Sequence, residues 1–148
     1  MENNPQKYQT LTKQLSPKPP ILRNVAVAFV VGGLICMFGQ FVQNIFLTYF
    51  NFTPETVGNP TVAVMIFIAA LLTGLGVYDK LGQFAGAGSA VPVTGFANSI
   101  TSAAMEHRSE GLVLGVGGNM FKLAGSVIVF GVVAAFFIAL IKTLWRMI

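Results

Sequence analysis

The most constraining feature of this chain is an uncharged run of 25 residues, Leu81–Met105, with the sequence LGQFAGAGSAVPVTGFANSITSAAM. Its length suits a membrane crossing, because about 20 apolar residues span the hydrocarbon of a bilayer. Glycines and Pro92 interrupt the run, and serine, threonine, asparagine and glutamine make it polar. Broken backbone is tolerated at membrane depth only where protein buries it or where it lines a water-filled cavity. Transporters build binding sites from such segments, so the run indicates passage of a solute across a membrane.

The composition indicates an integral membrane protein. Of its 148 residues, 54% are hydrophobic and only 9% are charged, whereas a soluble domain is about 25% charged. The net charge of +4 comes from basic residues that mostly flank apolar segments, as juxtamembrane anchors do. We therefore expect a lipid bilayer, and no nucleic acid, as the surroundings of this protein.

The apolar runs predict an all-α integral membrane protein with about four transmembrane helices, the third of them broken. We expect residues 1–24 to form a polar, proline-containing cytoplasmic arm and residues 25–148 to form a single membrane domain. The expected helices cover residues 25–50, 60–78, 82–106 and 111–145.

The distribution of basic residues predicts the orientation of these helices. Four crossings with both termini in the cytoplasm leave only Arg108 on the outer side, in agreement with the positive-inside rule. The basic residues of the inner side are then Lys7, Lys13, Lys18, Arg23, Lys80, Lys142 and Arg146.

Small residues recur within the broken segment. Gly82, Gly86 and Ala90 are spaced by four residues, which makes a smooth ridge on a helix. Such a ridge serves helix–helix packing, or it lines a pathway; the spacing alone leaves both open. Together with Gly88 and Pro92, these residues are expected to break the helix and to pack against its neighbours.

The helix that restarts at Pro92 predicts a second feature, a polar site inside the membrane. The 15 residues Pro92–Glu106 reach about 22 Å at 1.5 Å per residue, which is short of the bilayer core. Their N-terminus would open within the membrane and attract anions, with Ser89 and Thr94 beside it. Thr94, Asn98 and Ser102 then form a polar stripe, either an interhelical hydrogen-bonded seam or the wall of a wet pathway.

Lys122 is the one basic residue within an apolar stretch, and the sequence leaves two interpretations of its position open. If the last crossing begins at Gly111, Lys122 lies about 16 Å deep at helical rise, where an ionisable side chain faces a cavity or a partner. However, the 19 uncharged residues Leu123–Ile141 are nearly enough to cross alone, which would leave Lys122 at the interface. A buried Lys122 and the helix end at Pro92 would make a positive site suited to a carboxylate.

No pattern of residues indicates an enzyme, a metal site or a cofactor. His107 is the only histidine, and it lies in a charged island, Glu106–Glu110. The chain shows no metal-ligand cluster, catalytic triad or phosphate-binding loop. Cys36 is the only cysteine, so an internal disulfide is excluded and a packing role is expected.

Several segments resemble a known family. They are VGGLICMFGQ (31–40), LLTGLGVYDKLGQFAGAGSAVPVTGFANSI (71–100) and EGLVLGVGGNMFKLAGSVIVFGVVAAF (110–136). These are similar to the SpoVAC family, small membrane subunits of the SpoVA system of endospore-forming bacteria. The resemblance runs from about Lys18 to Leu140. A sister subunit, Eb, has a similar core, but the long arm and the Lys18-Pro19-Pro20 motif favour the C type.

This resemblance implies a role in moving dipicolinic acid with calcium, inward into the forespore and outward at germination, with opening that responds to membrane tension. It also implies the inner spore membrane, and other SpoVA subunits, such as D and Eb, as partners. In that membrane, the distribution of basic residues places both termini on the core side. It supplies no ligand residues. Four crossings are a narrow conduit for a rigid aromatic dicarboxylate, so a homo- or hetero-oligomer is expected. The alternative is a subunit that supports the same complex without conducting.

Overall fold

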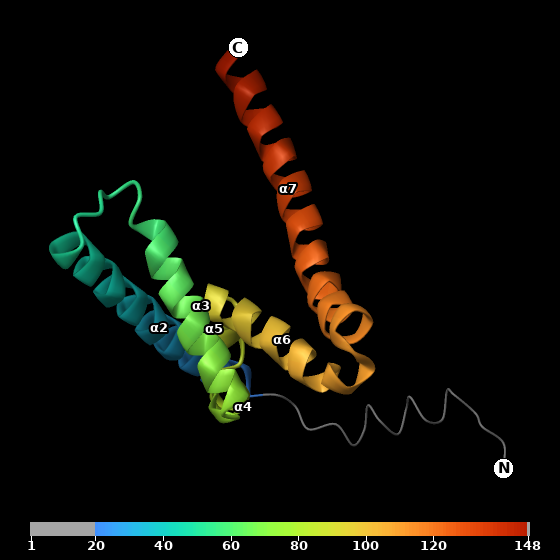
Figure 1. Cartoon of the computed structure of the whole chain (residues 1–148). Coiled ribbons are helices and arrows are strands. Elements are labelled where there is room, and N and C mark those ends of the chain that lie inside the picture. The colour runs from blue at the N-terminus through green and yellow to red at the C-terminus, as the bar shows by residue number, and fades with distance from the viewer. Residues whose placement is uncertain (1–19, 148) are drawn as a thin grey trace.

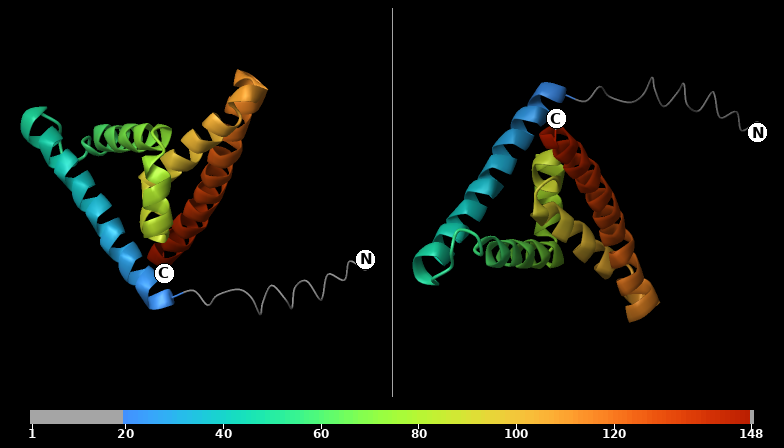
Figure 2. Two further views of the ribbon diagram at one scale, coloured as in Figure 1. Left: turned by 90° about the horizontal axis from the view of Figure 1, so that it is seen from below. Right: turned by 90° about the horizontal axis from the view of Figure 1, so that it is seen from above.

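The structure, a computed structural model, describes residues 20–147, and this part of the chain is all-helical, as the sequence predicts. Its elements in order are α2 (Ile21–Tyr49), α3 (Gly58–Gly74), α4 (Val77–Ala85), α5 (Ala87–Ala90), α6 (Val93–Glu106), η1 (Arg108–Glu110), η2 (Leu112–Gly117) and α7 (Gly118–Met147). Two long helices, α2 and α7, flank the short helices α3 to α6 (Figures 1 and 2).

The first helix, α2, has 29 residues, about 43 Å at helical rise, and is long enough to cross a bilayer. It begins four residues earlier than predicted, because the carbonyl O of Pro20 already accepts the first helical bond from Asn24. Most of the expected arm, residues 1–19, lies outside the described residues. The helix ends at Tyr49, and Asn51 follows in a left-handed conformation with φ of 55°.

The second predicted helix, residues 60–78, ends too late. The structure ends α3 at Gly74 and starts a new helix at Val77, with an angle of 103° between the two axes. Gly76 causes this break, since its φ of 69° is the left-handed conformation that terminates helices. Its N–H donates to the carbonyl O of Thr73. Tyr78 therefore belongs to the next helix.

The expected third helix, residues 82–106, is broken at two points and becomes parts of α4, α5 and α6. Gly86 separates α4 from α5 with φ of 53° and ψ of −124°, a conformation that side chains with a Cβ avoid. Pro92 separates α5 from α6 as the extended N-cap of α6. A broken helix was predicted here, but the four-residue ridge of Gly82, Gly86 and Ala90 is divided between α4 and α5.

The core lies where these short helices meet. α3 packs along α6, and α2 packs against α5. Ala69, Tyr78 and Ala97 form the buried centre, with Leu72 and Leu81 packed against it. Small side chains at this centre allow the backbones of three helices to approach one another.

The last span matches its predicted range of 111–145 within one residue. η2, a turn of π-helix, and α7 together form a membrane-capable stretch, Leu112–Arg146. α7 packs against α6 and η2 near its start, and from Ser126 to Arg146 every side chain is exposed. In a bilayer this surface faces lipid or another subunit.

The number of membrane crossings is two or three by helix length and apolar character within the described residues. α2 and Leu112–Arg146 qualify alone, and α3 with α4 qualifies only if the bent pair counts as one broken span. The four crossings predicted from the sequence are not confirmed, because α3 has 17 residues and α6 has 14. These lengths correspond to about 25 and 21 Å at helical rise.

Candidate functional site

Five hydrogen-bonding side chains from four short helices converge beside the helix breaks, and we call them the polar junction. Thr73, Tyr78, Ser89 and Thr94 expose 4%, 4%, 2% and 6% of their surface, and Asn98 is partly buried. Buried polar groups are costly unless they are hydrogen-bonded. No buried side-chain nitrogen or oxygen of the described residues lacks a partner, so the junction is internally satisfied.

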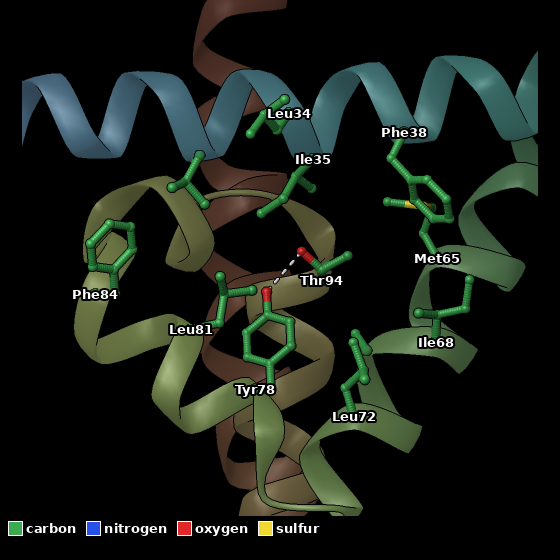
Figure 3. Close-up of a pocket in the computed structure, with 12 residues that line it drawn as sticks. Leu34, Ile35, Phe38, Met65, Ile68, Leu72, Tyr78, Leu81, Phe84 and Thr94 are labelled. Atoms are coloured by element: carbon green, nitrogen blue, oxygen red, sulfur yellow. Dashed lines mark hydrogen bonds between the residues drawn. The ribbon is translucent and has the colours of Figure 1, made fainter.

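Tyr78 is the centre of the polar junction. Its hydroxyl oxygen lies 2.9 Å from the carbonyl O of Ser89 and 2.9 Å from Oγ1 of Thr94 (Figure 3). A phenol has one proton and a carbonyl oxygen only accepts. Tyr78 is the donor in both contacts, so its single proton is shared between the Ser89 carbonyl and the Thr94 hydroxyl. Through these two bonds α4 holds the end of α5 and the start of α6 together.

The second connection joins α3 to α6. Oγ1 of Thr73 lies 2.7 Å from the carbonyl O of Ala69 and 2.8 Å from Oδ1 of Asn98. Both partners accept, so the single hydroxyl proton of Thr73 is shared between them. Since these residues lie 25 positions apart, the bond sets how α6 lies along α3.

The structure brings together three of the five residues predicted to line a pathway. Ser89, Thr94 and Asn98 belong to the polar junction, and Oγ of Ser89 also donates to the carbonyl O of Gly86. Ser102 and Lys122 have exposed side chains, and neither hydrogen-bonds to the junction. Their part in a pathway stays a prediction.

Two members of the junction were missed by reading the sequence. Thr73 and Tyr78 were placed in one continuous helix, where no reason to single them out is visible. The signal that marks them is Gly74-Leu75-Gly76, since a glycine in a C-terminal capping position predicts a helix end. With a break there, Tyr78 lies in a new helix that can turn back toward α6.

The start of α6 is covered by protein. Thr94 and Gly95 in its first turn are buried. A Cβ added to Gly95 would overlap the carbonyl oxygens of Ala90 and Ser89. Backbone acceptors of α5 thus lie against the end that was expected to open toward an anion, and within one chain they offset its partial positive charge.

A cavity of about 440 Å³ lies between α2, α3, α4 and α6, and Tyr78 and Thr94 of the polar junction are among the residues that line it (Figure 3). Its only side-chain hydroxyls are those of Tyr78 and Thr94, which bond to each other. No charged side chain lines it, so it offers no cationic group to pair with a carboxylate and no carboxylate to bind a cation. The lining residues are Val31, Leu34, Ile35, Phe38, Met65, Ile68, Ala69, Leu72, Tyr78, Leu81, Phe84 and Thr94.

Gly88 lies directly against the backbone of α2. A Cβ at Gly88 would overlap the carbonyl O of Ala28 and would lie 2.8 Å from its Cα. On the facing side, a Cβ at Gly32 would lie 3.3 Å from the carbonyl O of Gly88. Ala28 and Gly32 are one turn apart on α2, so the backbone of α5 packs directly against two small residues of α2. Gly86, by contrast, has open space where a Cβ would be, and its conformation is what requires glycine.

Comparison with known proteins adds an independent finding. Residues 24–141 match the family described as SpoVAC/SpoVAEB sporulation membrane protein. The chain is 61% identical over 142 residues to Stage V sporulation protein AC of Bacillus subtilis (strain 168), which covers 96% of this chain and 95% of that protein. No solved structure matches.

Proposed function

The chain belongs to the SpoVAC/SpoVAEB family of sporulation membrane proteins, and from this membership we propose that it is a membrane subunit of the SpoVA system that moves dipicolinic acid with calcium. It takes part in import into the forespore and in release at germination, and membrane tension contributes to opening. The lipid bilayer and the other SpoVA subunits, including the D and Eb components, are its partners.

One observation supports transport above all, namely the segment between Gly76 and Glu106. It contains three short helices, two breaks and a buried set of hydroxyl groups. Uninterrupted helices are sufficient for a protein that only anchors a complex. Broken helices beside a polar site are instead the means by which transporters form solute pathways in a membrane.

The pathway that we propose lies between subunits. The cavity that Tyr78 and Thr94 line is otherwise apolar, and the start of α6 is covered by α5. A dicarboxylate and a calcium ion therefore need a surface that several chains build together. Ser102 and Lys122 have exposed side chains and are the predicted pathway residues available to such a surface.

For orientation we propose four crossings in the inner spore membrane, with both termini on the core side. α2, the α3–α4 pair, the α5–α6 pair and Leu112–Arg146 are the four segments. Single cysteines in a Cys36→Ala background test this with a membrane-impermeant thiol reagent. Labelling from outside at position 55 but not at position 142 is expected, and the reverse would contradict the arrangement.

Transport itself is tested with a cysteine at Ser102 in the same Cys36→Ala background, in spores that lack the native gene. If Ser102 faces the pathway, reaction with a bulky thiol reagent after germination is triggered should slow the release of dipicolinic acid. A cysteine at Ile128, which is 61% exposed on α7, is the matched control. Equal release after labelling at both positions would argue against a pathway at Ser102.

A non-conducting structural subunit is the second candidate, and the hydrogen bonds of Thr94 and Asn98 favour it. Both side chains already have partners within the chain, as an interhelical seam requires. On this alternative, neither residue becomes accessible to water during release, and only changes that disturb packing reduce the amount of assembled complex.

A further inference from the structure

A polar pair on α2 has no hydrogen-bond partner from any other helix within residues 20–147. Nε2 of Gln40 donates to Oδ1 of Asn44 at 3.1 Å, one helical turn away, and both side chains are exposed. This bond leaves one N–H and the carbonyl oxygen of Gln40, and both N–H groups of Asn44, without a partner in the described residues.

The pair lies at a depth where water is absent. α2 and its flanks carry no charge between Arg23 and Glu55, and Tyr49 and Phe50 mark the interfacial end, as aromatic residues do. Asn44 then lies about 8 Å and Gln40 about 14 Å along the helix from Tyr49. Both are inside a hydrocarbon layer about 30 Å thick, where lipid chains offer no hydrogen bond.

The face that carries this pair points away from the rest of the chain. Val42, two residues after Gln40 and so about 200° around the helix, is buried against the other helices. Gly33, two turns before Gln40 on the same face, has open space where a Cβ would be. α2 also forms one outer edge of the helix assembly in both views of Figure 2.

We propose that this face of α2, around Gly33, Gln40 and Asn44, binds the same face of a second copy of this chain. Two copies cross the membrane in the same direction, so a two-fold axis along the membrane normal brings each residue opposite itself. An amide both donates and accepts, so Gln40 is complementary to Gln40 and Asn44 to Asn44. Gly33 allows the two backbones to approach, the combination that membrane helices use to associate.

Cys36 provides a test with the natural protein, because it is exposed one turn before Gln40. A disulfide requires the two Cα atoms to lie within about 7 Å. Oxidation of native membranes with copper phenanthroline should give a dimer whose linked peptide is Cys36 to Cys36 by mass spectrometry. A Cys36→Ser, Phe41→Cys variant is the matched control. Phe41 is 60% exposed but lies about 100° from Gln40 around α2, so it should not cross-link.

The amides themselves are tested by Gln40→Leu with Asn44→Leu, which removes both amide groups and leaves apolar side chains in their place. We expect about tenfold weaker dimerisation in lipid vesicles, the effect of two interhelical hydrogen bonds of ordinary strength in membranes. Gln43→Leu, on a neighbouring face, should leave dimerisation unchanged. Three results would each overturn the proposal: no Cys36 dimer, Cys36 linked to a different protein, or unchanged dimerisation of the double leucine variant.

Discussion

Replacing Gly88 by alanine is expected to destabilise the membrane domain, because α5 lies backbone to backbone on α2. The new Cβ would overlap the carbonyl O of Ala28 and would lie 2.8 and 2.9 Å from its Cα and carbonyl carbon. Ordinary carbon–carbon contacts are about 3.5 to 4.0 Å. Since the three nearest atoms all belong to the backbone of Ala28, no side-chain rotation relieves the overlap with them, and the two helices must move apart.

The expected decrease in the free energy of unfolding follows from two opposing effects. Overpacking of a tight contact costs about 1 to 3 kcal/mol, and because the overlap at Gly88 is with backbone, its cost lies near the upper end of this range. Alanine in place of glycine within a helix recovers at most about 1 kcal/mol. The free energy of unfolding of Gly88→Ala should therefore fall by about 2 kcal/mol, which is roughly a thirtyfold change in the ratio of folded to unfolded protein.

Gly131→Ala is the matched control, because Gly131 lies in α7 with nothing within 4 Å of an added Cβ. Its stability should stay equal to that of the natural protein or rise by up to about 1 kcal/mol. Both variants are compared by denaturant unfolding in the same detergent micelles. If Gly88→Ala proves as stable as Gly131→Ala, the close approach of α2 and α5 described above is wrong.

Three further changes probe the breaks and the charge. Tyr78→Phe leaves the Ser89 carbonyl unpaired and should lower the free energy of unfolding by about 1 to 3 kcal/mol. Its control, Tyr49→Phe, changes a side chain that is 76% exposed and should alter the free energy of unfolding by less than about 0.5 kcal/mol. Equal effects of the two changes would argue against the polar junction. In Gly86→Ala the added Cβ contacts no neighbouring atom, but the left-handed backbone should cost about 1 to 3 kcal/mol of strain, measured in the same unfolding assay. An unchanged free energy of unfolding would mean that this turn relaxes without cost. Dipicolinate flux from liposomes with a constant subunit set should fall in the order Lys122→Arg, Lys122→Gln, Lys122→Glu if Lys122 attracts the anion, whereas equal flux of the Gln and Glu variants would make Lys122 an interfacial anchor.

Much of the architecture is local and was therefore predictable. The uncharged stretch after Arg23 and the apolar stretch after Gly111 become α2 and the η2–α7 span with ends close to those expected. Helix length and lack of charge are properties of the sequence alone, because the bilayer requires both. The break at Pro92 and a special role for Gly86 follow from the restricted and permissive backbones of these two residues. Gly76 carried the same kind of signal for the end of α3.

What the sequence by itself determined is thus an all-helical membrane protein with a broken, polar segment. Only the tertiary structure decided which groups meet there: that Tyr78 reaches Ser89 and Thr94, that Thr73 reaches Asn98, and that Gly88 is the glycine pressed against α2. In a soluble protein the apolar face of a helix marks its core, but in a membrane lipid-facing and buried side chains are equally apolar. The facing surfaces are therefore chosen by backbone approach and by pairs of hydrogen-bonding side chains, which come from residues 16 and 25 positions apart in the chain.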